Sequence, residues 1–178
     1  MAQDKAAARG LVTLVLGGAR SGKSRYAEGL ITQSPKPWIY VATAEALDDE
    51  MAERITAHRA RRDAGWQTLE APHDLAAAVG QAPADAALLV DCLTLWLSNL
   101  MERGFDIEAE TARLEEALAA RKGPTVLVSN EVGLGIVPDN ALARRFRDLQ
   151  GELNQRLAAQ AARVVMMVAG IPIAVKSP

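Results

Sequence analysis

The sequence predicts a domain of the α/β class, in which helices cover a mostly parallel central sheet. Short apolar, β-prone runs alternate along the chain with segments of helical periodicity, which is the pattern of such sheets. The composition agrees, because 49% of the 178 residues are hydrophobic and 24% are charged, enough for one sizeable core. A glycine-rich loop also stands between the first apolar run and the first helix, as in nucleotide-binding α/β folds.

The elements follow one another in an order that supports this class. The expected strands are residues 11–16, 38–43, 65–70, 86–91, 125–129 and 164–169. The expected helices are residues 24–31, 48–63, 74–79, 93–102, 106–121 and 139–162. A turn at residues 170–172 then leads into a short tail, residues 173–176. We expect residues 1–10 to be a frayed leader and residues 11–178 to form a single domain, since no linker or repeat divides them.

The loop after the first strand fits the pattern G-x-x-x-x-G-K-[ST]. Its backbone N–H groups can surround phosphate oxygens, and the start of the following helix adds a favourable dipole. In such a loop the lysine reaches the β- and γ-phosphates and the hydroxyl residue ligates Mg²⁺. The sequence therefore predicts a nucleotide-binding loop made of Gly17, Gly18, Ala19, Arg20, Ser21, Gly22, Lys23 and Ser24.

Two further strand ends are candidates for the same rim, because ligands of such sheets collect at the carboxyl ends of the strands. Asp91 closes a buried apolar strand and resembles the Walker B aspartate, which orients Mg²⁺ or its water. We therefore predict Ser24 and Asp91 as magnesium ligands. Ala42, Thr43 and Ala44 end another strand and are candidate nucleotide contacts, although a plain strand end without contacts is equally compatible with such small residues.

The helix expected at residues 48–63 carries a candidate nucleophile, His58. Arginines lie one turn before and after it, at positions 54, 61 and 62. Neighbouring guanidinium groups disfavour the cationic form of an imidazole, and the neutral form can attack phosphorus. The same arginines could hold a triphosphate through charge-assisted hydrogen bonds. The alternative is a half-buried helix histidine beside a solvated basic face.

Charge and cysteine content narrow the class of partner. The net charge of −2 provides no basic field for nucleic acid or an anionic membrane. The one cysteine, Cys92, excludes an intramolecular disulfide framework and is expected in the core. No apolar run approaches the ~20 residues of a membrane span, so we expect a cytoplasmic protein. His73 is expected to be a surface or capping residue.

The sequence resembles the bifunctional adenosylcobinamide kinase / adenosylcobinamide-phosphate guanylyltransferase family of cobalamin biosynthesis. The resemblance covers about residues 11–176. It rests on the loop at 17–25 together with Ala42-Thr43, Leu47–Met51, Arg54-Ile55 with His58, Asn130–Pro138, and the tract from Asn140 to Leu157. The loop alone is shared with many kinases, whereas the combination is specific to this family.

The resemblance implies a P-loop fold of the RecA-like type, a homotrimer and two reactions on a corrinoid. One reaction phosphorylates adenosylcobinamide with ATP or GTP. In the other, a histidine that matches His58 takes GMP from GTP and passes it to adenosylcobinamide phosphate. Ala57 precedes His58 where some relatives carry a second histidine, and Asp91 stands where some carry Glu. The implied nucleotide contacts are residues 17–24, Ala42, Thr43, Ala44, Arg59, Ala60, Arg61, Arg62, Glu70 and Asp91.

Two other functions are compatible with the loop itself. A monofunctional small-molecule kinase would transfer the γ-phosphate without forming a covalent nucleotide. A RecA-like ATPase module would hydrolyse nucleotide and change its binding to a partner. A nucleic-acid motor is not favoured, because the sequence lacks a basic stripe.

Overall fold

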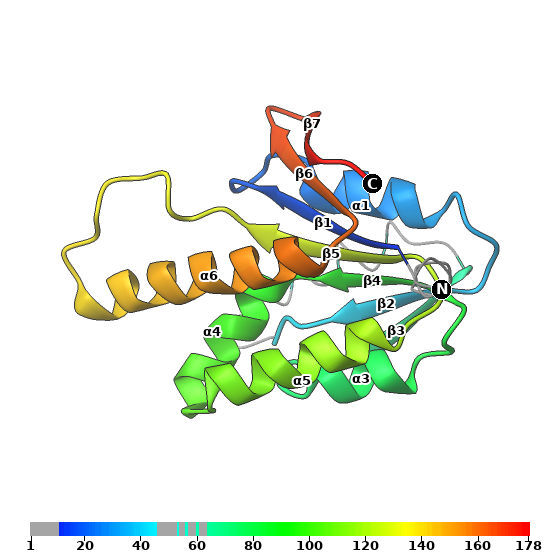
Figure 1. Cartoon of the computed structure of the whole chain (residues 1–178), viewed down its shortest axis with the longest axis horizontal. Coiled ribbons are helices and arrows are strands. Elements are labelled where there is room, and N and C mark those ends of the chain that lie inside the picture. Colours follow the sequence, from blue (N-terminus) through cyan, green and yellow to red (C-terminus); the bar gives the residue numbers. More distant parts are fainter. Residues whose placement is uncertain (1–10, 46–52, 54–55, 57–59, 61–63) are drawn as a thin grey trace, which may run out of the picture.

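The structure is a computed structural model that describes residues 11–45, 53, 56, 60 and 64–178. These residues form a seven-stranded sheet with the strand order β3-β2-β4-β5-β1-β6-β7 (Figure 1). Every neighbouring pair is parallel except β6 and β7. The strands are β1 Val12–Gly17, β2 Trp38–Ala42, β3 Trp66–Glu70, β4 Ala87–Asp91, β5 Thr125–Asn130, β6 Arg163–Val168 and β7 Ile171–Lys176.

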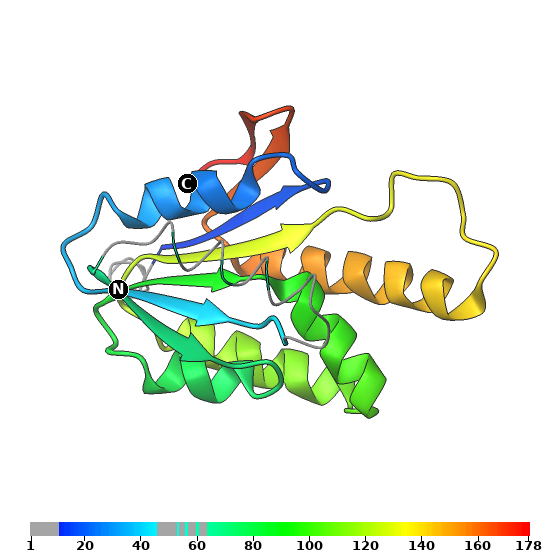
Figure 2. The same ribbon diagram turned by 180° about the vertical axis from the view of Figure 1, so that it is seen from behind.

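Helices cover both faces of this sheet, giving three layers (Figures 1 and 2). On one face, α1 packs through Ala27 and Ile31 against β-strand side chains such as Val15 and Val128. The other face carries the remaining labelled helices, whose leucines share a second core cluster with Leu14 and Leu127. The helices are α1 Lys23–Ile31, α3 Leu75–Gln81, α4 Leu93–Arg103, α5 Ile107–Ala119 and α6 Ala141–Gln160. The α/β, mostly parallel P-loop fold class expected from the sequence is confirmed.

The central strands are apolar throughout because both of their faces are buried. β2 and β4 each present four consecutive buried residues, and β5 presents five. Polar side chains then cap the helices that follow the strands and loops: Asp74 accepts from the Ala77 N–H, and Asp106 accepts from the Ala109 N–H. Local sequence and long-range packing thus agree on where these elements begin.

The predicted tail after residue 172 was wrong, because this segment is strand β7. It pairs antiparallel with β6 across a tight turn in which Ala169 and Gly170 both have positive φ. Pro172 suggested a chain break, yet proline is compatible with an edge strand, where one side of the backbone needs no partner. β7 forms the free edge of the sheet, and all of its residues are exposed.

The helix predicted at residues 48–63 falls mostly outside the described residues. Glu53, Thr56 and Ala60 have helical backbone and are exposed. The apolar side chains of α6 are buried in its second half, at Leu153 and Leu157. Figure 1 shows the first turns of α6 and the loop before it extending away from the sheet. Among the described residues, no helix is long and apolar enough to cross a membrane.

Candidate nucleotide-binding site

The phosphate loop connects β1 directly to α1, as the sequence predicted. Gly22 has φ 94° and is the N-cap of α1, with no side chain to occupy the first N–H groups of that helix. A Cβ at Gly17 would lie 2.6 Å from Ser21 Oγ and 2.7 Å from the Met167 carbonyl oxygen. Both positions therefore require glycine. The Ser21 hydroxyl is buried without a hydrogen-bond partner among the described residues, which suits a loop that offers its polar groups to a ligand.

Lys23, the first residue of α1, has its ammonium group inside this loop. Its Nζ donates a hydrogen bond to the Gly18 carbonyl oxygen at 2.5 Å, and the residue is buried. Burial lowers the pKa of Lys23, and the nearby Cys92 and Asp91 oppose that shift. A partly desolvated ammonium interacts with phosphate oxygens more strongly than one in water. This lysine is consequently well placed to hold the phosphates of a nucleotide.

Asp91 ends β4, which is separated from β1 by β5 alone. Its Oδ2 accepts a hydrogen bond from the Tyr40 hydroxyl at 3.0 Å, and β4 and β2 are adjacent strands. Together with the half-buried Ser24 hydroxyl, this carboxylate supplies the hard oxygen donors that Mg²⁺ prefers. The residues present thus fit a magnesium ion.

The strand ends at Ala42, Thr43 and Ala44 lie on the same rim, but Thr43 also has a structural role. Its side chain is completely buried, its Oγ1 donates to the Cys92 carbonyl oxygen at 2.7 Å, and it accepts from the Cys92 N–H at 2.9 Å. Asn99 of α4 donates to the Thr43 carbonyl oxygen at 2.8 Å. These bonds join the ends of β2 and β4. Glu70 closes β3 in register with Ala42 and is exposed.

The predicted nucleophile and its arginines cannot be placed. His58, Arg59, Arg61 and Arg62 lie outside the described residues, while Ala60 is an exposed helical residue. Glu45 is the last residue of the described stretch 11–45. Its carboxylate lies 3.7 Å from His73 Nε2 and 3.6 Å from the Arg103 guanidinium. His73 stacks on Phe105 with ring centroids 5.7 Å apart. Of the two roles expected for His73, surface or capping, the cap of α3 is instead Asp74, and His73 is partly exposed.

Several supporting residues could not be found from the sequence. Tyr40, Asn99 and Thr94 carry no motif, and each meets its partner only after strands or helices far apart in sequence are brought together. Asn130, which belongs to the tract Asn130–Pro138 of the family resemblance, is in register with Gly17, the first residue of the phosphate loop.

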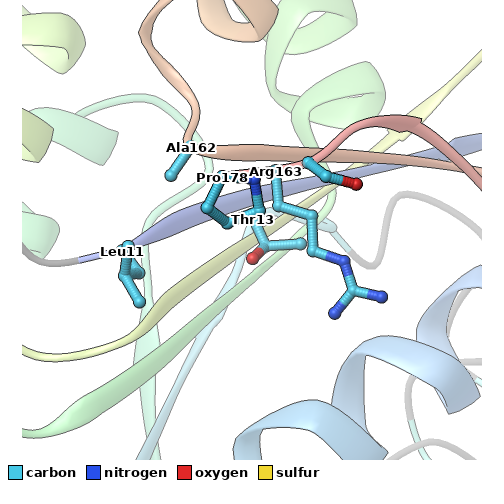
Figure 3. Close-up of a pocket in the computed structure, with 6 residues that line it drawn as sticks. Leu11, Thr13, Ala162, Arg163 and Pro178 are labelled. Carbon is cyan, nitrogen blue, oxygen red and sulfur yellow. The ribbon is translucent and has the colours of Figure 1, made fainter.

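A separate hollow lies at the amino-terminal end of β1, away from the phosphate loop (Figure 3). In it the Arg163 guanidinium donates to the Tyr26 hydroxyl at 3.2 Å. Its lining comes from strand starts and the chain end, namely Leu11, Thr13, Ala162, Arg163, Ser177 and Pro178. No described residue of the predicted nucleotide site lines it. The described residues also contain no group of three or more histidine, cysteine, aspartate or glutamate side chains that could hold a metal ion.

Solved structures with a similar fold share little sequence identity with this chain. The flagellar accessory protein FlaH from Methanocaldococcus jannaschii aligns with a TM-score of 0.54 and 12% identity, over 95% of this chain and 79% of its own. An ATPase of the type III secretion system of pathogenic bacteria aligns with a TM-score of 0.55 and 10% identity, over 90% of this chain and 51% of its own. The RadB recombinase aligns with a TM-score of 0.50 and 16% identity, over 89% and 74%. These similarities establish the fold alone.

Sequence relatives are much closer. The bifunctional adenosylcobalamin biosynthesis protein CobP of Pseudomonas aeruginosa is 50% identical over 166 residues, spanning 92% of this chain and 96% of its own. The proteins named CobU from Salmonella typhimurium and Escherichia coli are 43% and 41% identical, each over 93% of this chain and 100% of its own. The profile of the cobinamide kinase / cobinamide phosphate guanyltransferase family matches residues 13–175. This chain therefore belongs to the cobinamide kinase / cobinamide phosphate guanyltransferase family.

Proposed function

We propose that this protein phosphorylates adenosylcobinamide with ATP or GTP, and then transfers GMP from GTP to the resulting phosphate to give adenosylcobinamide-GDP. The observation that carries the proposal is the complete phosphate loop, with Lys23, Ser24 and Asp91 on one rim, in a chain that the family profile matches from residue 13 to 175. Family membership makes a monofunctional kinase or a RecA-like ATPase module the less favoured alternative.

In the kinase reaction, the substrate hydroxyl oxygen forms a bond to the γ-phosphorus. The bond from that phosphorus to the β,γ-bridging oxygen breaks, the nucleoside diphosphate leaves with the electron pair, and the hydroxyl proton passes to solvent. Lys23 would hold the β- and γ-phosphates. Ser24 and Asp91 would hold Mg²⁺, which when bound neutralises charge on the phosphates. Tyr40 keeps the Asp91 carboxylate oriented through its hydrogen bond to Oδ2.

In the nucleotidyl transfer, a neutral nitrogen of His58 would attack the α-phosphorus of GTP and pyrophosphate would leave. A phosphate oxygen of adenosylcobinamide phosphate would then attack the same phosphorus, and the histidine would be released. Two displacements replace one difficult step. Arg54, Arg61 and Arg62 would favour the neutral imidazole, and Arg59, Arg61 and Arg62 would contact the triphosphate. Support for these roles is the resemblance and the arginine-rich sequence around His58.

The remaining nucleotide contacts and the assembly are part of the same proposal. We propose that Gly17, Gly18, Ala19, Arg20, Ser21 and Gly22 surround the phosphates, and that Ala42, Thr43, Ala44, Ala60 and Glu70 contribute to the nucleotide pocket. We also propose that residues 11–178 act as one domain, that the protein is cytoplasmic, and that it is a homotrimer. Exposed apolar side chains on two parts of the chain support self-association.

Replacing Lys23 with alanine tests the kinase half. We expect Lys23→Ala to lower γ-phosphate transfer to adenosylcobinamide by at least about 100-fold, because the variant lacks the charge that the transition state requires. The measurement is the initial rate of label transfer from γ-labelled GTP or ATP in the presence of Mg²⁺. Lys122→Ala is the matched control, since Lys122 is exposed and precedes β5 at the other end of the sheet.

The two variants separate the possible results. Loss of transfer in Lys23→Ala with a wild-type rate in Lys122→Ala supports the proposed kinase site. Equal rates in the wild type and in Lys23→Ala would show that this loop is not where γ-phosphate transfer occurs. A wild-type protein that hydrolyses nucleotide without phosphorylating the corrinoid would instead favour the ATPase alternative.

A further inference from the structure

The strand order places the side-chain amide of Asn130 at the centre of the rim. β5 lies between β1, which leads into the phosphate loop, and β4, which ends at Asp91. The last residue of β5 is Asn130, in register with Gly17, and Asp91 is in register with Val128 on the same strand. The end of β5 must therefore lie between the loop and the carboxylate.

The alternation of side chains along β5 shows on which face of the sheet the Asn130 side chain lies. Val126 and Val128 pack in the same cluster as Ala27 of α1. Ser129 points to the opposite face, where its Oγ donates to Asn154 Oδ1 of α6 at 2.7 Å. Because successive side chains of a strand alternate between faces, Asn130 shares the α1 face with Val128. Lys23 and Ser24 are on α1, so Asn130 faces the same side as the groups proposed to hold the phosphates.

The backbone of Asn130 is held by side chains from two helices. Its N–H donates to Thr94 Oγ1 of α4 at 2.8 Å, and its carbonyl oxygen accepts from Asn154 Nδ2 of α6 at 3.1 Å. Both supporting side chains are buried, and Gln150 extends this network through bonds to Ser129 and Asn154. Buried polar groups carry a desolvation cost. The hydrogen bonds of this network offset that cost, and they fix the backbone from which the Asn130 side chain projects.

The Asn130 carboxamide itself makes no hydrogen bond with any described residue, and the residue is half-buried. An amide carries two N–H donors and no charge, so it can donate to a phosphate oxygen without changing the net charge of the site. A carboxylate at the same place would repel phosphate. A fixed, unpaired donor on the face of the sheet that carries the lysine is suited to charge that develops on the terminal phosphate.

We propose that the Asn130 carboxamide donates a hydrogen bond to the γ-phosphate of the bound nucleotide and is a catalytic residue of the kinase step, held in position by Thr94 and Asn154. This inference rests on the proposed kinase function. It assigns to Asn130 a contact with the end of the triphosphate, away from the α-phosphorus at which guanylylation would occur. The two half-reactions should accordingly respond differently when the amide is replaced.

The test compares Asn130→Asp with Asn140→Asp, which makes the same change of charge at the N-cap of α6. Aspartate caps a helix as well as asparagine, so the control should fold and react normally. Three quantities are measured for each protein: γ-phosphate transfer to adenosylcobinamide, covalent labelling by α-labelled GTP, and the affinities for GTP and GDP. We expect Asn130→Asp to slow γ-phosphate transfer by about 100-fold and to keep most of the covalent labelling.

The variant Thr94→Val tests whether the hydrogen-bond network positions Asn130. It removes the acceptor of the Asn130 N–H while leaving the Asn130 side chain in place, and we expect γ-phosphate transfer to fall by about tenfold. Thr111→Val is its control, because that buried hydroxyl bonds only within α5, to the Ile107 carbonyl oxygen. If Thr94→Val and Thr111→Val have the same γ-phosphate transfer rate, the positioning role of the network is wrong.

The results for Asn130→Asp test the hydrogen bond between the Asn130 carboxamide and the γ-phosphate. An Asn130→Asp transfer rate within about threefold of Asn140→Asp would overturn the inference, as would an equal loss of γ-phosphate transfer and α-phosphate labelling. If the wild type fails to phosphorylate the corrinoid, the proposed function fails, but the nucleotide affinities still test Asn130. In that case the inference requires Asn130→Asp to weaken GTP binding more than GDP binding, and equal weakening would contradict it.

Discussion

At the scale of single residues, the site brings together three ionisable groups, the Lys23 ammonium, the Cys92 thiol and the Asp91 carboxylate. Lys23 and Cys92 are both buried, and the carboxylate of Asp91 acts on each of them. Burial lowers the pKa of Lys23, whereas burial, followed by the charge of Asp91, raises the pKa of the Cys92 thiol to about 11. Cys92 is therefore a protonated core residue at neutral pH and is not suited to act as a nucleophile.

The raised pKa of Cys92 predicts a loss of stability at alkaline pH. In the unfolded chain the thiol ionises near its ordinary value of 9.0, so between pH 9.0 and about 11 the folded state retains a proton that the unfolded state has released. The free energy of unfolding must then fall as the pH rises through that range, by about 2 kcal/mol at most. Cys92→Ala should lack this part of the fall.

The measurement is denaturant unfolding of both proteins at about pH 8 and about pH 10.5. The lowered pKa of Lys23 has the opposite sign, since it makes the folded state gain stability as pH rises towards 10.5, but it is present in both proteins and largely cancels in the comparison. A buried, protonated thiol requires the difference in unfolding free energy between the two proteins to shift in favour of Cys92→Ala at the higher pH. A difference that stays constant with pH would be inconsistent with a buried, protonated thiol.

The sequence was sufficient for some site residues and insufficient for others, for a physical reason. The phosphate loop is contiguous, so its glycines and Lys23 can be recognised from their spacing. Thr43 bonds to Cys92, which is 49 positions further along, and Tyr40 bonds to Asp91 across 51 positions. Such pairs depend on strand order, which no local pattern encodes. Asn130 follows the strand expected at residues 125–129, and only the register of β5 places it next to the phosphate-loop strand.

At the scale of elements, two segments leave apolar side chains exposed. The loop between β5 and α6 exposes Leu134 by 82% and Ile136 by 96%, and the first turns of α6 add Leu142. On the free edge of the sheet, β7 exposes Ile171, Ile173 and Val175. Two apolar surfaces on separate elements suit a heterologous contact, in which one surface of each copy binds the other surface of the next and the ring closes.

This arrangement predicts a homo-oligomer. We expect light scattering after gel filtration to give a mass three times the 19.0 kDa of the chain. Ile136→Glu should shift the protein towards the monomer, because a charge placed in an apolar contact is costly to desolvate. Glu152→Gln on α6 is a control with an exposed side chain. A wild-type mass equal to one chain would contradict the prediction, and so would an unchanged mass in Ile136→Glu.

The exposed edge also explains the least accurate part of the sequence-based prediction. Buried strands such as β4 are apolar runs and were recognised, whereas β7 is fully exposed and contains Pro172 near its start. Ile171, Ile173 and Val175 do alternate along β7, but the face that they form is exposed, and the pairing with β6 depends on the turn through Ala169 and Gly170. Edge strands are therefore the elements for which periodicity is least informative.

At the scale of the whole molecule, the carboxyl ends of the parallel strands form one rim that carries the predicted site residues. The phosphate loop, Ala42, Glu70, Asp91 and Asn130 all end parallel neighbouring strands, so the topology alone gathers them on one rim (Figure 1). The α/β class could be predicted because alternating strands and helices determine it. The strand order could not, since several orders are compatible with the same sequence of elements.

The central claim is that a single chain uses this rim for two kinds of attack on a nucleotide, and covalent labelling tests it most directly. The protein is incubated with GTP labelled at the α-phosphate and Mg²⁺, and the adduct is located by peptide mapping. The account predicts an acid-labile, alkali-stable label on His58 that is absent from His58→Ala and that passes to adenosylcobinamide phosphate when this acceptor is added. No label on the wild type, or label that persists in His58→Ala, would contradict it.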